Sequence, residues 1–108
     1  MLDAKKYTYR TQWSEEDKVY IARCLEFSSL SAHGDTHEEA LKEIQTVVNE
    51  SIEWMKSENE TIPQPFGFKN FSGRYPLRIS PELHRELAIR AAEQNVSLNQ
   101  YIQIKLAG

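Results

Sequence analysis

The spacing of apolar residues divides the first part of the chain into short strands and one long helix. Residues 7–13 alternate aromatic or β-branched residues with polar ones, which is typical of a half-buried strand. A polar turn at 14–18 precedes residues 19–25, which are rich in strand formers and predict the returning strand. Residues 27–34 are ambiguous, and their end is compatible with a third short strand that stops at Gly34.

A long amphipathic helix follows at about residues 36–57. Thr36 and Glu39 have the spacing of a capping box, in which the Thr36 hydroxyl accepts the Glu39 N–H and the Glu39 side chain reaches back to the Thr36 N–H. Apolar residues recur at the 3.6-residue period at Leu41, Ile44, Val48, Ile52 and Met55. Pro63 prevents the helix from continuing. This part of the chain therefore predicts an α+β fold, a small antiparallel sheet covered by one helix.

The last part of the chain predicts one strand and two helices. Residues 74–79 alternate strictly between an apolar face of Tyr75, Leu77 and Ile79 and a polar face of Arg74, Pro76 and Arg78. Ser80 followed by Pro81 is a helix start, and Asn95 is suited to the left-handed residue that ends a helix. Ser97 and Gln100 form a second capping-box pattern.

A lone strand in a segment of about 36 residues cannot satisfy its backbone or build a core of its own. Both problems disappear if two chains pair their strands antiparallel and interleave their helices. The resulting ribbon would present Arg74, Pro76 and Arg78 of each chain, and the DNA major groove admits such a ribbon. The N–H groups near Ser97, at the start of the second helix, would suit a phosphate.

Charge and length support a division into two parts with different partners. The chain has 108 residues, a length that allows one ordinary domain or two small ones. Its net charge is −3. Residues 1–68 carry a net charge of −6 and residues 69–108 carry +3. An asymmetry of this size can also arise by chance. We expect domains at 1–62 and 73–108, joined by a linker at 63–72.

Composition and motifs argue against several other classes of protein. No apolar run is long enough for a membrane helix and the N-terminus does not resemble a signal peptide, so we expect a cytoplasmic protein without membrane contact. A single cysteine, Cys24, fits a reducing compartment and is expected to be buried rather than nucleophilic. His33, Asp35 and His37 are close in sequence but lack the spacing of a metal site. We expect no metal, no cofactor and no enzymatic activity.

Residues 74–83 and 91–102 resemble the ribbon-helix-helix repressors. The resemblance implies that Arg74, Pro76 and Arg78 occupy the positions that read base edges, and that Ser97 and Asn99 occupy positions that hold DNA phosphate. Two departures matter. Asn95 replaces the usual glycine, which the left-handed conformation tolerates. Pro76 cannot donate to a strand ladder or make a polar base contact, which leaves two arginines per chain as base readers.

The first part resembles the N-terminal domain of HicB antitoxins, most specifically in the motif Gly34-Asp35-Thr36 followed by Glu38-Glu39-Ala40-Leu41. The two resemblances together cover nearly all of the chain. They imply a partial RNase H-like domain without nuclease activity, which binds a HicA-type mRNA-cleaving toxin, joined to a dimeric ribbon-helix-helix module that binds operator DNA and represses its own operon. A homodimer and a tetramer of two such dimers are both compatible with the sequence.

Two alternatives stay open. One is a stand-alone ribbon-helix-helix transcriptional regulator whose first domain senses a small ligand or a protein. The other is an RNA-processing hydrolase that uses His33, Asp35 or His37. The neighbouring gene discriminates the antitoxin from the stand-alone regulator, because a short basic reading frame with a catalytic-looking histidine favours a toxin pair.

Overall fold

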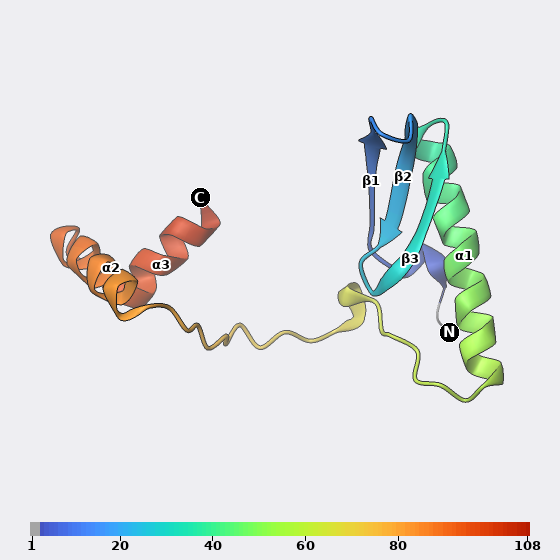
Figure 1. The fold of residues 1–108 in the computed structure, drawn as a ribbon. Helices are drawn as coiled ribbons and strands as arrows, with labels where there is room; N and C mark the ends of the chain where they lie inside the picture. Colours follow the sequence, from blue (N-terminus) through green and yellow to red (C-terminus); the bar gives the residue numbers. More distant parts are fainter. Residues whose placement is uncertain (1–2) are drawn as a thin grey trace. The chain divides into compact units, whose positions relative to one another are not determined.

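The computed structural model describes residues 3–108, and its contacts divide the chain into two units, Met1–Phe71 and Ser72–Gly108. The first unit contains the elements η1 (Ala4–Lys6), β1 (Tyr9–Ser14), β2 (Val19–Cys24), β3 (Phe27–Gly34), α1 (His37–Ser57) and η2 (Phe66–Phe68). The second unit contains α2 (Pro81–Glu93) and α3 (Leu98–Ala107). Within the described residues the chain is thus α+β, with a three-stranded antiparallel sheet and three α-helices (Figure 1), and this confirms the predicted fold class.

The three strands form one antiparallel sheet in the order β1-β2-β3. Thr11 of β1 and Ala32 of β3 both lie opposite Ala22, so these three residues share one face of the sheet. The register shifts between Arg23 and Cys24, next to the tight connection from β2 to β3. The third strand, which the sequence left ambiguous, is present and ends at Gly34 as expected.

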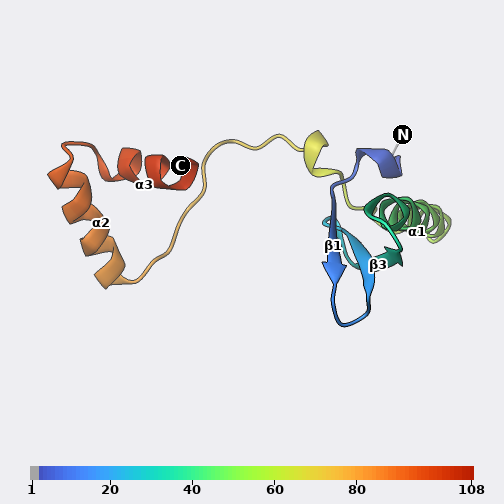
Figure 2. The same ribbon diagram turned by 90° about the horizontal axis from the view of Figure 1, so that it is seen from above.

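Helix α1 covers one face of the sheet, mainly over β2 and β3 (Figure 2). Its buried residues are the small or branched side chains Ala40, Ile44, Val48 and Ile52. They meet Ala22, Cys24 and Phe27 of the sheet in a single core cluster. The helical stripe predicted from the sequence is therefore the face that packs, because burying this apolar surface is the main source of stability available to the first unit.

The start of α1 differs in one contact from the predicted capping box. The Thr36 hydroxyl accepts the Glu39 N–H at 3.1 Å, as expected. The Glu39 carboxylate, however, accepts the N–H of Asp35 at 3.0 Å rather than that of Thr36. The Glu39 side chain thus accepts from an N–H one residue further from the helix, and this bond joins the loop after β3 to the first turn of α1.

The end of α1 uses a left-handed asparagine. Asn59 has a φ of 55°, and its N–H donates to the Lys56 carbonyl at 3.2 Å. The next N–H, that of Glu60, donates to the Met55 carbonyl at 2.9 Å. These two bonds form a Schellman motif, which satisfies carbonyls that the helix end would otherwise leave unpaired.

The chain after α1 returns to the sheet before it leaves the first unit. The Tyr7 hydroxyl donates to the Pro63 carbonyl at 2.6 Å, and Pro65 is fully buried. The Phe66 N–H donates to the Glu26 carboxylate at 2.9 Å. The segment predicted as a linker, residues 63–72, therefore begins with residues that are anchored on the first unit. Its prolines prevent a helix, yet one of them packs in the interior.

The second unit consists of two capped helices after an extended segment. The Ser80 hydroxyl caps α2, and Ser97 forms a full capping box with Gln100 at the start of α3, as predicted. Asn95 has a φ of 57° and ends α2 in the left-handed conformation, also as predicted. The two helices pack against each other, and Ala91 and Tyr101 are the unit's only buried hydrophobic residues among those described.

Residues 74–79 are not a strand in the structure, although their alternation predicts one. A strand is defined by hydrogen bonds to a neighbouring strand, and this segment has no such neighbour within the described chain.

No helix formed by residues 3–108 is both long enough and apolar enough to span a lipid bilayer.

Gly34 allows the end of β3 to approach the first turn of α1 closely, and we predict that Gly34→Ala destabilises the first unit. A Cβ atom at this position would lie 2.5 Å from the Ala40 nitrogen and 2.7 Å from the Glu39 Cβ. Because these are backbone and Cβ atoms that cannot rotate away, we expect a loss of about 1–3 kcal/mol in the free energy of unfolding, measured by urea denaturation.

Gly67→Ala is the matched control, because nothing lies within 4 Å of a Cβ atom built there. We expect it to leave the unfolding midpoint close to that of the wild type. Equal midpoints for Gly34→Ala and Gly67→Ala would show that the close approach has no energetic consequence.

Candidate functional site

The extended segment before α2 exposes both faces of its alternating pattern. Arg74, Pro76 and Arg78 are exposed, as expected of a polar face. The apolar face is exposed as well: Tyr75 is 86% accessible and Leu77 is 56% accessible. An alternating segment is stabilised by burial of its apolar side chains, so this segment lacks the surface that would cover them.

The same segment lines an apolar groove with α3. The groove has a volume of about 830 Å³ and is lined by Arg74, Tyr75, Pro76 and Leu77 on one side, and by Asn99, Ile102, Gln103 and Leu106 on the other. Arg74, Pro76 and Asn99, which the sequence predicts as DNA contacts, thus line one groove. The other two predicted contacts, Arg78 and Ser97, are not among the residues that line it.

The start of α3 has backbone donors suited to an anion. Ser97 is engaged in its cap: its hydroxyl accepts the Gln100 N–H at 3.0 Å, and its N–H donates to the Gln100 side chain at 3.1 Å. Asn99 lies in the first helical turn, where backbone N–H groups have no partner within the helix. The N–H groups of Leu98 and Asn99, rather than those of Ser97 and Gln100, are therefore the donors free to meet a phosphate.

In the first unit, the histidines and the aspartate that could suggest a metal do not form a site. The Nδ1 atom of His37 lies 2.6 Å from the Thr11 hydroxyl, and its ring packs against Tyr20. His33 and Asp35 are exposed. Among residues 3–108, no group of three or more His, Cys, Asp or Glu side chains is arranged to hold a metal ion.

Cys24 is buried, as predicted, with 1% of its surface accessible. Burial raises the pKa of its thiol above the ordinary value, so the reactive thiolate is disfavoured. This cysteine fills space beneath α1 and is not placed to act as a nucleophile.

Glu26 has a structural role that the sequence did not reveal. Its carboxylate accepts the Thr8 N–H and hydroxyl, each at 3.0 Å, and the Phe66 N–H at 2.9 Å. Burial alone would raise the pKa of Glu26, but the hydrogen bonds from Phe66 and Thr8 outweigh it and hold the pKa below its ordinary value. One carboxylate thus joins the residue before β1, the β2–β3 connection and the chain after α1. No sequence pattern around Glu26 indicates this role, because its partners Thr8 and Phe66 are 18 and 40 residues away in the chain.

Comparison with known proteins gives one finding. The model of the HicB family matches residues 56–106, which run from the end of α1 through nearly all of the second unit. The match supports a HicB-type protein. It is consistent with the antitoxin role in a toxin–antitoxin system. No curated protein and no solved structure gives a significant match to the chain.

The region of this HicB-type match contains all five predicted DNA contacts, Arg74, Pro76, Arg78, Ser97 and Asn99. It does not include the sheet of the first unit or the motif that begins at Gly34. The contacts remain predictions at the level of single residues.

We predict that the Glu26 anchor makes the first unit sensitive to acid. A carboxylate whose pKa is lower in the folded than in the unfolded state stabilises the fold above its unfolded pKa, close to the ordinary 4.5, and loses this contribution as the pH falls through the folded value. Glu26→Gln should therefore lower the free energy of unfolding by about 1–2 kcal/mol near neutral pH. The difference from the wild type should shrink as the pH falls to about 3 in urea denaturation.

Glu50→Gln, which removes an exposed carboxylate of α1, serves as the control and should leave stability nearly unchanged. A constant difference between the wild type and Glu26→Gln across the pH range would contradict a role for the ionised carboxylate.

Proposed function

We propose that the chain is the antitoxin of a HicAB-like type II toxin–antitoxin pair. In this proposal the first unit binds and neutralises a HicA-type mRNA-cleaving toxin in the cytoplasm. The second unit pairs with that of another copy, binds operator DNA and represses the operon. The observation that carries the proposal is the HicB family match over residues 56–106.

The incomplete second unit supports pairing with another copy. Its single-chain core holds only Ala91 and Tyr101 among the described residues, while Tyr75, Leu77 and Leu106 remain exposed. Antiparallel pairing of two 74–79 segments would supply each with the backbone partner it lacks and bring their apolar faces onto the helices. A ribbon-helix-helix dimer meets both requirements.

Charge supports two different partners. Residues 69–108 carry a net charge of +3, which a dimer doubles, and their exposed arginines Arg74 and Arg78 suit guanine edges and phosphates. Residues 1–68 carry −6, which is complementary to a basic ribonuclease. A ribonuclease is expected to be basic because its substrate is a polyanion.

A regulator that acts without a toxin is the alternative. Co-expression with the adjacent gene separates the two functions, because only an antitoxin would co-purify with its product and rescue growth from it. An adjacent gene product that does not bind this chain would leave the stand-alone regulator as the better proposal.

Arg78→Ala tests the operator contact. If Arg78 reads a guanine, each contact contributes about 1–3 kcal/mol, and a dimer makes it twice, so operator affinity should fall about 30-fold or more in a gel-shift titration. Toxin neutralisation should persist, because the substitution lies in the second unit.

Arg85→Ala removes an exposed arginine of α2 that is not among the predicted base contacts. As the control, it should change operator affinity far less than Arg78→Ala does. Equal gel shifts for wild type and Arg78→Ala would remove the base-reading role from Arg78.

Toxin binding should weaken with salt. Attraction between an acidic first unit and a basic toxin is screened over about 10 Å at 0.1 M salt, so raising the salt to about 0.5 M should slow association and weaken affinity. Surface plasmon resonance at the two salt concentrations measures both. An affinity and an association rate independent of salt would show that charge complementarity does not steer this complex.

A further inference from the structure

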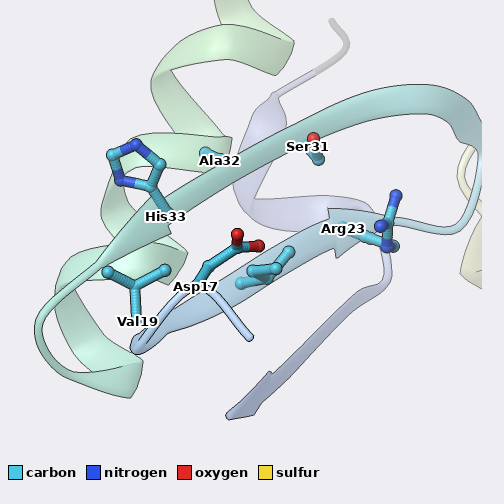
Figure 3. Close-up of a pocket in the computed structure, with 7 residues that line it drawn as sticks. Asp17, Val19, Arg23, Ser31, Ala32 and His33 are labelled. Atoms are coloured by element: carbon cyan, nitrogen blue, oxygen red, sulfur yellow. The ribbon is translucent and has the colours of Figure 1, made fainter. Parts of the chain in front are cut away.

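The sheet of the first unit has a second face, which α1 does not cover. Strand alternation places on it the residues between those that face α1. Arg10, Gln12 and Ser14 come from β1, Val19, Ile21 and Arg23 from β2, and Ser31 and His33 from β3. We call these eight residues the open face. In Figure 3, β2 and β3 carry Val19, Arg23 and His33, with α1 behind the strands.

Two arginines lie directly opposite each other on the open face. Arg10 and Arg23 are cross-strand partners in the β1–β2 register, and both side chains are exposed. They are also the only arginines in the first 73 residues of the sequence. Like charges in directly opposed positions destabilise a strand pair, so this arrangement works against the stability of the sheet.

Neither arginine has a counter-ion within the part of the chain that the structure describes. The ion pairs found there join Lys18 to Glu15, Lys56 to Glu53 and Arg90 to Glu86. Acidic residues are not scarce, since residues 1–68 contain thirteen. The two opposed arginines are therefore a pair of uncompensated positive charges on an acidic unit.

Arg23 also lines a shallow depression whose walls are partly polar and partly apolar. A cavity of about 560 Å³ is lined by Val19, Ile21, Arg23, Ser31 and His33 of the open face, together with Asp17 and Ala32. Val19 and Ile21 are half-buried and form its apolar part. Along β2, Arg23, Ile21 and Val19 are separated by two residues each. This is the spacing of side chains on one face of an extended chain.

We propose that the open face binds an acidic segment of a protein partner. Arg10 and Arg23 hold one carboxylate of that segment, and Ile21 and Val19 receive aliphatic side chains two and four residues further along it. Guanidinium groups match a carboxylate well because their N–H donors can meet both of its oxygens. The carboxylate also relieves the repulsion between the two arginines.

A protein segment fits this face better than a nucleic acid does. The −6 charge of residues 1–68 repels a polyanion more strongly than it repels a segment that carries a single carboxylate. The open face carries no Phe, Tyr or Trp on which bases could stack. Val19 and Ile21 can receive aliphatic side chains. The proposal is independent of the toxin and operator partners proposed above.

The test uses the full chain and the peptide acetyl-Glu-Ser-Val-Ser-Val-amide, whose alternate side chains match the arginine pair, Ile21 and Val19. The NMR signals of the Arg10 and Arg23 side chains and of the Ile21 methyls should shift as the peptide is added up to about 10 mM, a range that detects millimolar affinity. The same peptide with Lys in place of Glu should not shift them. No shift with the Glu peptide, or equal shifts with both, would overturn the proposal.

The double variant Arg10→Gln/Arg23→Gln should bind the Glu peptide at least about tenfold more weakly. Lys5→Gln/Lys42→Gln removes two exposed lysines from the same unit, so it matches the change in net charge and should bind as the wild type does. An equal loss in both variants would show that net charge, rather than the arginine pair, controls binding.

Two further readouts separate this role from others. Without bound peptide, the melting temperature of Arg10→Gln/Arg23→Gln should equal or exceed that of the wild type, because a like-charge pair is removed. A marked fall would assign the arginines to stability. A single-stranded RNA decanucleotide should leave the open-face signals in place, and an arginine-dependent shift with this RNA would replace the protein segment with a nucleic acid.

Discussion

The packing of α1 against one face of the three-stranded sheet is the interaction on which the first unit depends. Ile44, Val48 and Ile52 supply the helical side of the core, and Ala22 with Cys24 supplies much of the sheet side. The small residues of the sheet and Gly34 at its edge let the helix approach closely. Since a single helix cannot cover both faces of a sheet, this packing leaves the opposite face in solvent with its two opposed arginines.

The second unit shows what happens when such a covering element is missing. Its local structure is well defined, with hydroxyl caps at Ser80 and Ser97 and a left-handed residue at Asn95. Its apolar strand-like segment nevertheless exposes Tyr75 and Leu77. Capping contributes about 1 kcal/mol for each helix and cannot replace a core. The two units thus differ less in local order than in how much apolar surface each buries by itself.

Sequence reasoning succeeded where the controlling contacts are local. The helix bounds and the serine and threonine caps follow from patterns within about four residues, and the structure has them. The departure at Glu39 is small because Asp35 and Thr36 offer neighbouring N–H groups to the same carboxylate. The strand predicted from the alternation at 74–79 does not form in the structure, because a strand needs a partner strand and this segment has none.

Sequence patterns alone predict the α+β class, the amphipathic faces, the caps and the separation of an acidic from a basic part. They suffice because side-chain period, backbone capping and charge are properties of neighbouring residues. The hydrogen bond from Phe66 to Glu26, the burial of Pro65 and the pairing of Arg10 with Arg23 appear only once the chain is folded. Those contacts depend on strand register and on the path of the chain after α1, which hydrophobic burial sets across the whole unit.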